Sequence, residues 1–253
     1  MEVARVAALR GHQVSLFEAE STLGGGQLAL AQAAPFKEKL GWFKEYLTRE
    51  LERLPVDVRL RSPVDAATVE REAPEVLVVA TGAVPLVPDI PGIGGENVVT
   101  AHHLLRGEAV PQGKRVVVLG GRQVGCETAE YLALRDNSVT IVARSPADQL
   151  ADDAPNTYRN ALLKRLGNGG VELIVEHDVR EVLKDGLTLV GPGGTERFLP
   201  ADLVVIARGV VAQRSLADEM GSRVDEVHVI GDSQEPRTIA EAMYEGTLLG
   251  RQI

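Results

Sequence analysis

KRVVVLGGRQVGCETAEYLA (residues 114–133) decides the fold of this chain, because a short apolar strand runs through two glycines directly into a helical pattern. A strand, a glycine-rich turn and a helix in this order are the context that a dinucleotide-binding fingerprint requires. In such a turn the first glycine bends the chain, the second admits a pyrophosphate and the third lets helix and strand pack closely. Gly120 and Gly125 fill the first and third places, whereas Arg122 stands in the second.

The same turn allows two interpretations, because a glycine turn can bind a nucleotide or persist as a structural remnant. A helix N-terminus directs backbone N–H groups at a bound phosphate, so the candidate nucleotide-binding residues include Gly121 and Arg122 beside the two framing glycines. The Arg122 side chain either blocks the close approach of a pyrophosphate or contacts the phosphate itself. The pattern favours nucleotide binding and leaves the role of Arg122 open.

The rest of the chain alternates between short apolar stretches and helical periodicity. Apolar strands that alternate with helices indicate an α/β fold with a parallel sheet covered on both faces. In the helix expected at residues 36–54, Trp42 and Tyr46 stand four apart and predict a packing stripe. The predicted helices cover residues 2–10, 36–54, the stretch from the glycine turn to 135, and 239–253; the predicted strands cover 13–18, 56–60, 75–82, 114–121, 138–143, 171–176, 202–209 and 227–232, with a hairpin across 187–199.

Two segments of the chain repeat each other at a spacing of 125 positions. Six identities without a gap favour a duplicated dinucleotide-binding unit over a chance likeness between two strand–helix units. A second pair of similar segments is VLVVATGAVP (76–85) and LVVIARGVVA (203–212), each a predicted strand that ends in a glycine turn. The identical pairs are Glu2/Glu127, Ala4/Ala129, Ala8/Ala133, Leu9/Leu134, Arg10/Arg135 and Val14/Val139.

The repeat predicts that the first domain lacks its initial strand. Residues 114–126 supply the second copy with a strand and a glycine loop, and the same spacing would place their counterparts before Met1. The first copy therefore begins at the helix that follows a phosphate-binding loop. Each buried N–H or C=O group left unpaired costs about 1–3 kcal/mol, so we expect pairing with another chain, an altered strand order or low stability.

Composition limits the classes of partner and chemistry. The 253 residues carry 27 Lys and Arg against 36 Asp and Glu, a net charge of −9, so neither nucleic acid nor an anionic membrane is expected as a partner. Cys126 is the one cysteine, which excludes a disulfide, a CxxC redox pair and a cysteine-ligated iron–sulfur cluster within this chain; we interpret it as a small buried helix residue. Without a signal peptide or a long apolar run, the expectation is a cytoplasmic protein with no metal ligands and no catalytic side chain.

The residue at the end of the second strand of each copy bears on the choice of nucleotide, because a carboxylate there binds the ribose. In the first copy this residue is Glu18, which fits an adenosine ribose. In the second copy the corresponding Ala143 is followed by Arg144. An arginine without a carboxylate suits a 2′-phosphate and favours NADPH over NADH; the alternative is that Arg144 is a solvated surface residue.

Four motifs in order give the chain its resemblance to a known family: LGGGQL (23–28), ATGAVPLVPDIPG (80–92), GGRQVGCETAEYLA (120–133) and VHVIGDSQEPRTIAEAMYEG (227–246). The whole chain resembles the C-terminal flavin- and nucleotide-binding half of the NADH:flavin oxidoreductases related to 2,4-dienoyl-CoA reductase. It is more distantly similar to 2-enoate reductase and to trimethylamine and histamine dehydrogenases. In that family a nicotinamide-binding domain is inserted into an FAD-binding domain, and an upstream barrel holds FMN, a four-iron–four-sulfur cluster and the substrate.

The resemblance implies roles for particular residues. Glu18 matches the glutamate on the adenosine ribose of FAD, and Gly231 and Asp232 match the pair that holds the ribityl-phosphate part of the flavin. Glu127 matches a position close to the nicotinamide; alternatively it is a first-turn carboxylate favoured by the helix dipole. The other matches are Gly24, Gly25 and Gln27 in a loop near the flavin, with one glycine more than the family's L-G-G-Q, and Thr81 and Gly82 in its A-T-G turn.

The departures from the family limit what is expected of this chain. The barrel, its FMN and its cluster are absent, Arg208 replaces a small residue, and Ser233 replaces the usual cysteine.

We expect two Rossmann-like domains: an FAD-type domain at 1–107 plus 226–253, and an inserted NAD(P)-type domain at 108–225.

The implied cofactors are FAD and either NADPH or NADH, and the implied function is electron transfer from NAD(P)H through FAD to an acceptor flavin or cluster in a partner region. A partner chain or a homo-oligomer is the expected assembly. The alternative is a non-catalytic fragment or a structural nucleotide-binding subunit.

Overall fold

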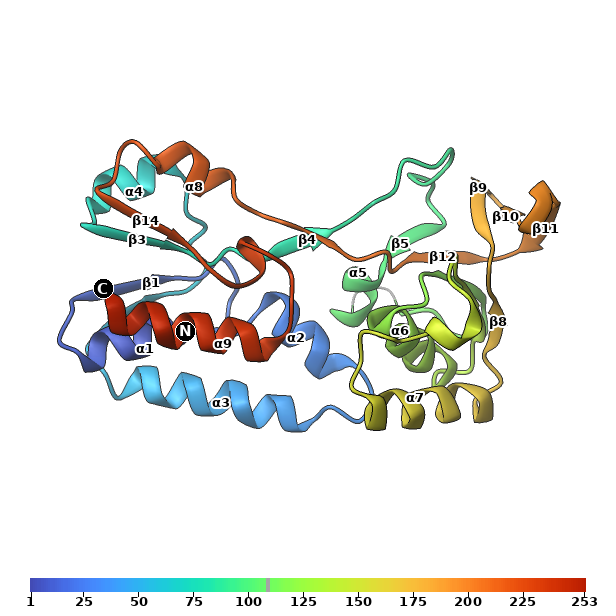
Figure 1. Cartoon of the computed structure of the whole chain (residues 1–253), viewed down its shortest axis with the longest axis horizontal. Helices are drawn as coiled ribbons and strands as arrows, with labels where there is room; N and C mark the ends of the chain where they lie inside the picture. The colour runs from blue at the N-terminus through green and yellow to red at the C-terminus, as the bar shows by residue number, and fades with distance from the viewer. Residues whose placement is uncertain (108–109) are drawn as a thin grey trace. The chain divides into compact units, whose positions relative to one another are not determined.

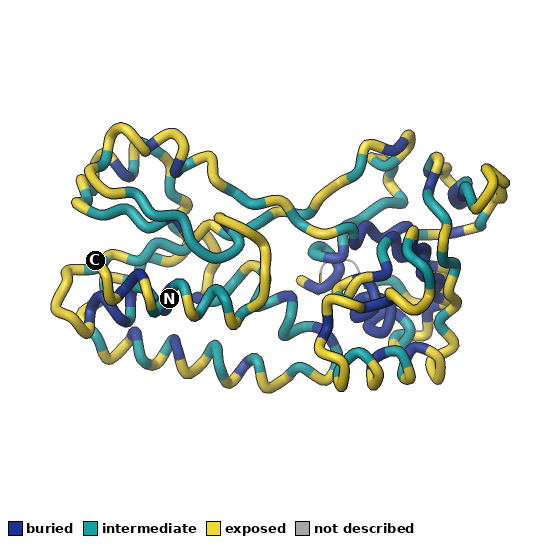
Figure 2. The backbone as a smooth tube through the Cα atoms, viewed as in Figure 1, coloured by how far each residue is buried: buried dark blue, intermediate teal, exposed yellow. Residues whose placement is uncertain are grey.

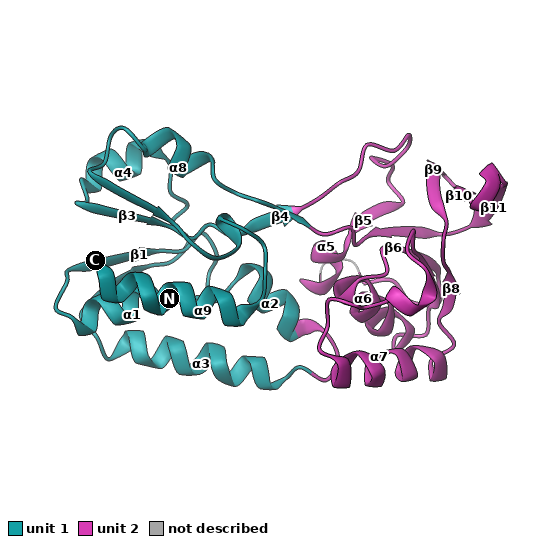
Figure 3. Cartoon of the chain, viewed as in Figure 1, with its two compact units in different colours: residues 1–32, 37–84, 210–253 teal, residues 33–36, 85–209 magenta. Residues whose placement is uncertain are grey.

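The computed structural model describes residues 1–107 and 110–253, which form two compact units (Figure 3). Unit 1 consists of residues 1–32, 37–84 and 210–253, and unit 2 of residues 33–36 and 85–209. The fold is α/β with parallel sheets, and unit 2 interrupts the sequence of unit 1, as predicted. The domain boundaries predicted at 107/108 and 225/226 remain predictions, and residue 108 lies outside the described residues.

Unit 2 is built on a five-stranded parallel sheet in the order β5-β12-β6-β7-β8 (Figure 1). The central strand, β6, pairs with β12 through Val116↔Leu203 and with β7 through Arg115↔Ser138. An antiparallel sheet of β9, β10 and β11 completes the unit. The bounds are β5 Val98–Thr100, α5 Ala101–Leu105, β6 Arg115–Leu119, α6 Gln123–Ala133, β7 Ser138–Val142, α7 Asn156–Asn168, β8 Glu172–Ile174, β9 Asp178–Leu183, β10 Gly186–Val190, β11 Glu196–Pro200 and β12 Leu203–Ile206.

The central strands of unit 2 are buried almost throughout. Every residue of β6 and β7 after the first is buried, as are the last three of β12. Such apolar strands, covered on both faces, are typical of a parallel sheet. The two ends of the main segment of unit 2 lie together, because the N–H of Leu86 donates to the carbonyl oxygen of Gly209 at 2.9 Å.

Unit 1 contains two separate two-stranded parallel sheets, β1-β2 and β14-β3. Its helix α1 packs against both α9 and α3 (Figure 1). The strands β4 Ala83–Pro85 and β13 Val210–Ala212 pair where the chain passes from one unit to the other. The other bounds are α1 Glu2–Leu9, β1 Val14–Phe17, α2 Gly26–Ala33, α3 Lys39–Glu52, β2 Val56–Arg59, α4 Ala66–Glu72, β3 Val76–Val79, α8 Ser215–Met220, β14 Glu226–Val229 and α9 Ile239–Gln252.

The sheets of unit 1 lack a counterpart of β6. By the internal repeat, β1 corresponds to β7 and β3 to β12, and in unit 2 both of those strands pair with β6. Among the described residues, β1 pairs with β2 alone and β3 with β14 alone. Most residues of these strands of unit 1 are accordingly half-buried, as Figure 2 shows. Among the described residues, the sheets of unit 1 therefore have no strand in the place of β6, as predicted for the first copy.

The packing stripe predicted at Trp42 and Tyr46 is wrong. The side of α3 that packs inward carries Leu47 and Leu51, which are buried. Trp42 and Tyr46 lie on roughly the opposite side of the helix, since each residue advances about 100°, and they are 66% and 52% exposed. A spacing of four places two residues on one face without determining which face is covered.

Across residues 1–107 and 110–253, no helix is both long enough and apolar enough to cross a lipid bilayer.

Cys126 is a fully buried residue of α6, as predicted, and its Sγ donates to the carbonyl oxygen of Gly121 at 3.4 Å. Burial, together with the negative charges of Asp153 and Glu127, raises the pKa of the thiol to about 12. The thiolate, which is the reactive form, is therefore scarce at neutral pH.

We expect Cys126 to resist alkylation in the folded protein at pH 8 and to react fully in urea, measured by mass spectrometry after iodoacetamide treatment. A Ser222→Cys variant, with a second thiol at an exposed position, is the matched control and should be labelled once in the native state. Rapid native labelling of Cys126 itself would contradict its burial.

Candidate functional site

The first candidate site lies where β6 ends at the carboxyl edge of the five-stranded sheet. Gly120 has a φ of +133°, and a Cβ there would come within 2.2 Å of the carbonyl oxygen of Ala207. A Cβ on Gly125 would come within 2.1 Å of the carbonyl oxygen of Gly120. Because real Cβ atoms do not approach oxygen so closely, both positions need glycine for β6, α6 and the end of β12 to pack together. This is the close helix–strand packing that dinucleotide-binding turns use.

The N-terminus of α6 already receives one carboxylate. The N–H of Gln123, the first residue of α6, donates to Asp153 Oδ1 at 2.8 Å. Arg122 is exposed, and its Nε lies 3.3 Å from Asp153 Oδ2. Gly121 contacts the same covering loop, since its carbonyl oxygen accepts a hydrogen bond from the N–H of Ala151 at 2.8 Å. A helix N-terminus that accepts a carboxylate is chemically suited to a phosphate as well.

Glu127 is a buried carboxylate held by two side-chain donors. Its Oε1 accepts hydrogen bonds from Gln123 Nε2 at 2.7 Å and from the Tyr158 hydroxyl at 2.9 Å. Glu127 lies in the second turn of α6, so its interpretation as a first-turn carboxylate is wrong. Burial, followed by the charge and the hydrogen bond of Glu127, raises the pKa of the Tyr158 phenol. Tyr158, which the sequence did not single out, is therefore a protonated donor to Glu127.

Arg144 is an exposed residue that directly follows Ala143 at the end of β7. It lies at the same edge of the sheet as Gly120, because parallel neighbours such as β6 and β7 end together. In an open parallel sheet, ligands bind at the carboxyl ends of the strands. Unit 2 therefore brings together the predicted residues Gly120, Gly121, Arg122, Gly125, Glu127 and Arg144.

A second group of predicted residues lies in unit 1, at the end of β1. Glu18 directly follows this strand, and its Oε1 accepts a hydrogen bond from the N–H of Glu20 at 2.9 Å. A Cβ on Gly25 would lie 4.0 Å from Glu18 Oε2, so the glycine loop passes beside this carboxylate. Gly24 has a φ of +67°, and Gln27 lies in the first turn of α2.

The turns after β3 and β14 contact each other within unit 1. The N–H of Gly82 donates to Ser233 Oγ at 2.6 Å, and Thr81 Oγ1 donates to the carbonyl oxygen of Gln213 at 2.9 Å. Ser233 is fully buried, so the residue that replaces the family's cysteine connects the two turns.

Glu245 of α9 supports the second of these turns, because its Oε2 accepts a hydrogen bond from the N–H of Gly231 at 2.7 Å. Asp232 Oδ1 accepts a hydrogen bond from the N–H of Arg237 at 3.2 Å. The sequence reasoning missed Glu245, although it stands on the terminal helix of the recognised motif.

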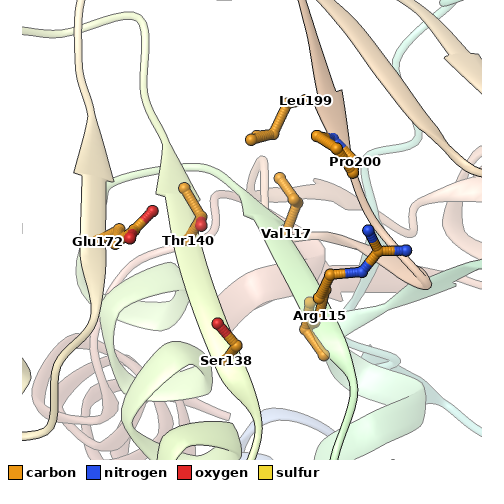
Figure 4. Close-up of a pocket in the computed structure, with 8 residues that line it drawn as sticks. Arg115, Val117, Ser138, Thr140, Glu172, Leu199 and Pro200 are labelled. Carbon is orange, nitrogen blue, oxygen red and sulfur yellow. The ribbon is translucent and has the colours of Figure 1, made fainter.

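A cavity of about 170 Å³ lies at the other edge of the sheet of unit 2 (Figure 4). Arg115, Ser138 and Glu172, which line it, are the first residues of β6, β7 and β8. Since ligands of such sheets bind at the carboxyl ends of the strands, this cavity is not the candidate nucleotide site.

The parallel sheets, the internal repeat and the glycine turn together define a Rossmann-like dinucleotide-binding protein. The family model described as pyridine nucleotide-disulphide oxidoreductase matches residues 1–246, and the chain belongs to this family. Membership implies a flavoprotein-type oxidoreductase that binds FAD and NAD(P)H.

Known relatives agree with this assignment. The chain is 36% identical over its whole length to an NADH oxidase from Thermoanaerobacter brockii and 35% identical over 98% of its length to a bilirubin reductase from Mediterraneibacter gnavus. The structure of a 2-naphthoyl-CoA reductase matches the whole chain with a TM-score of 0.93 and 30% identity. The chain spans only 39%, 38% and 38% of the lengths of these three proteins. The resemblance to part of a larger flavin oxidoreductase is confirmed.

We expect Gly120→Ala to lower the free energy of unfolding of unit 2 by about 2–4 kcal/mol, because its Cβ collides with the Ala207 carbonyl. Urea denaturation followed by circular dichroism measures this change. Gly167→Ala on α7 is the matched control: its Cβ would meet no atom within 4 Å among the described residues, and it should leave stability unchanged or raise it by up to about 1 kcal/mol. Equal effects of the two substitutions would refute the close packing.

We expect Tyr158→Phe to cost about 1–2 kcal/mol, because the buried Glu127 carboxylate loses a donor. The raised pKa also predicts a pH effect: above about pH 10 the unfolded state releases the phenolic proton that the folded state retains, so stability falls as pH rises. This decline should be smaller in Tyr158→Phe.

Tyr244→Phe, at an exposed position on α9, is the control and should change neither the free energy of unfolding nor its dependence on pH. Identical plots of stability against pH for both variants would exclude the hydrogen bond between Tyr158 and Glu127.

Proposed function

We propose that this chain is the part of an NAD(P)H-dependent flavin oxidoreductase that binds nicotinamide nucleotide in unit 2 and FAD in unit 1. The observation that carries the proposal is the Gly120–Gly125 turn, packed against Ala207 at the carboxyl edge of a parallel sheet and opening the helix α6. The names of the similar proteins, an NADH oxidase and several reductases, support the same reaction class.

In unit 2, the N–H groups around Gly121 and Arg122 would hold the nucleotide phosphates at the start of α6. Arg144 would face the adenosine ribose at the end of β7. Glu127, fixed by Gln123 and Tyr158, would lie toward the nicotinamide. A carboxylate with two fixed donors keeps one position, which suits a residue that orients a ring rather than one that transfers a proton.

In unit 1, Glu18 would bind the adenosine ribose of FAD beside the loop that carries Gly24, Gly25 and Gln27. Thr81, Gly82, Gly231 and Asp232 would hold the ribityl and flavin part, in turns that Ser233 and Glu245 fix. These residues would supply the contacts to FAD, and among the described residues no strand or glycine loop precedes α1. FAD, when bound, accepts a hydride and passes its electrons on; no side-chain acid or base is needed for the hydride transfer.

The proposed partner corresponds to the remaining three fifths, roughly, of the similar proteins. We propose that electrons leave unit 1 for an acceptor, a flavin or an iron–sulfur cluster, in a barrel-type partner region or chain. The small share of each relative that this chain spans supports such a partner.

A second candidate function is a structural, non-catalytic nucleotide-binding subunit. The half-buried strands of unit 1 favour it, since a sheet that lacks its central strand holds FAD less firmly. Unit 2 would then retain nucleotide binding while unit 1 served only as a scaffold.

Incubation of the purified chain with FAD, followed by desalting, separates the two candidates. We expect a retained flavin absorption band that anaerobic NADH or NADPH bleaches. Asp232→Ala should reduce flavin retention, whereas Asp225→Ala, at the opposite end of β14, should not. A chain that binds NAD(P)H but retains no flavin would support the structural subunit instead.

A further inference from the structure

An arginine and an aspartate that the proposed function does not use form an ion pair at the carboxyl edge of the sheet of unit 2. Arg208 follows β12, its side chain is 11% exposed, and its Nη2 lies 2.7 Å from Asp178 Oδ1. Asp178 is the first residue of β9, and its side chain is 49% exposed. A nearly buried guanidinium therefore holds a carboxylate that still faces solvent.

Backbone hydrogen bonds bring this carboxylate beside Arg144. The N–H of Glu176 donates to the carbonyl oxygen of Ser145 at 3.3 Å, and the N–H of His177 donates to that of Ala143 at 3.1 Å. These bonds bracket Arg144, so Asp178, the next residue of the second segment, lies at the end of β7. Burial opposes ionisation of Asp178, but hydrogen bonds from Arg208 and from the N–H of Val179, with the positive charges of Arg208 and Arg144, lower its pKa overall.

The end of β7 is where the adenosine ribose rests in a dinucleotide-binding sheet, and a carboxylate there accepts hydrogen bonds from the ribose hydroxyls. The sequence has Ala143 at this point, followed by Arg144, and an arginine without a carboxylate favours NADPH over NADH. The structure supplies the missing carboxylate from β9 instead. We infer that Asp178, held in place by Arg208, makes the nucleotide site of unit 2 bind NADH more tightly than NADPH. This inference rests on the proposed function of unit 2.

The charges explain the direction of this preference. A 2′-phosphate carries between one and two negative charges and would lie against the ionised Asp178, whereas a 2′-hydroxyl donates to it. The positive charge of Arg208 is already matched by Asp178, which reduces the attraction that this end of β7 offers to a 2′-phosphate. Without Asp178, the same edge becomes a cationic site suited to NADPH.

Isothermal titration of the 253-residue chain with NADH and with NADPH tests the inference. We expect the wild type to bind NADH at least about tenfold more tightly, a difference of about 1.4 kcal/mol. Asp178→Asn should shift the ratio of the two dissociation constants toward NADPH by about tenfold or more. Because this substitution leaves Arg208 nearly buried and unmatched, the double variant Asp178→Asn/Arg208→Gln is measured as well and should show the same shift.

Asp202→Asn is the matched control, because Asp202 also pairs with an arginine, Arg115, at 2.6 Å but at the amino edge of the sheet. It should leave the ratio unchanged. Tighter binding of NADPH by the wild type, or an unchanged ratio in both Asp178 variants, would overturn the inference and leave the nucleotide site standing. Failure of the wild type to bind either nucleotide would overturn both the inference and the proposed function of unit 2.

Discussion

The contact between the Gly120 turn and the carbonyl of Ala207 is the constraint on which unit 2 depends. It brings the ends of two neighbouring strands and the start of α6 within van der Waals distance, at positions where any Cβ would collide. Once these three elements meet, the register of the sheet places Arg144 after β7 and Arg208 after β12, and the start of α6 places Glu127. The backbone of this site is therefore fixed by the sheet, which suits the positioning of a cofactor.

The two units show what one strand contributes to such a sheet. In unit 2, β6 gives β7 and β12 a second neighbour, and the central strands are buried. In unit 1, the corresponding β1 and β3 have one neighbour each among the described residues, and most of their residues stay half-exposed. The difference lies in pairing and burial rather than in residue type, since both sets of strands are rich in valine and leucine.

The fold was accessible to sequence reasoning because its signals are local. The glycine turn and the apolar strands each depend on a few consecutive residues, and the internal repeat compares two such short segments; together they predicted the parallel α/β architecture and a first copy without its initial strand. Trp42 and Tyr46 were misplaced because helical spacing does not say which side of a helix its neighbours cover. Tyr158 and Asp178 escaped notice because each acts on a residue about 30 positions away, Glu127 and Arg208 respectively, through contacts that only the folded chain creates. The candidate cofactor-binding residues remain predictions, although the structure groups them by unit.

The hydrogen bond between Leu86 and Gly209, at the two ends of the main segment of unit 2, affects the stability of unit 1. Unit 1 consists of separate stretches of sequence, and the 125 residues between two of them, 85–209, form a loop whose ends must meet before those stretches can pack. If that loop were unfolded, its closure would cost about 4 kcal/mol of chain entropy from the length term alone. Folding of unit 2 brings the ends of the loop together in advance, so it makes a long insertion behave as a short one. Folding of unit 2 can therefore stabilise unit 1 through the connectivity of the chain, and a substitution that unfolds unit 2 would also destabilise unit 1.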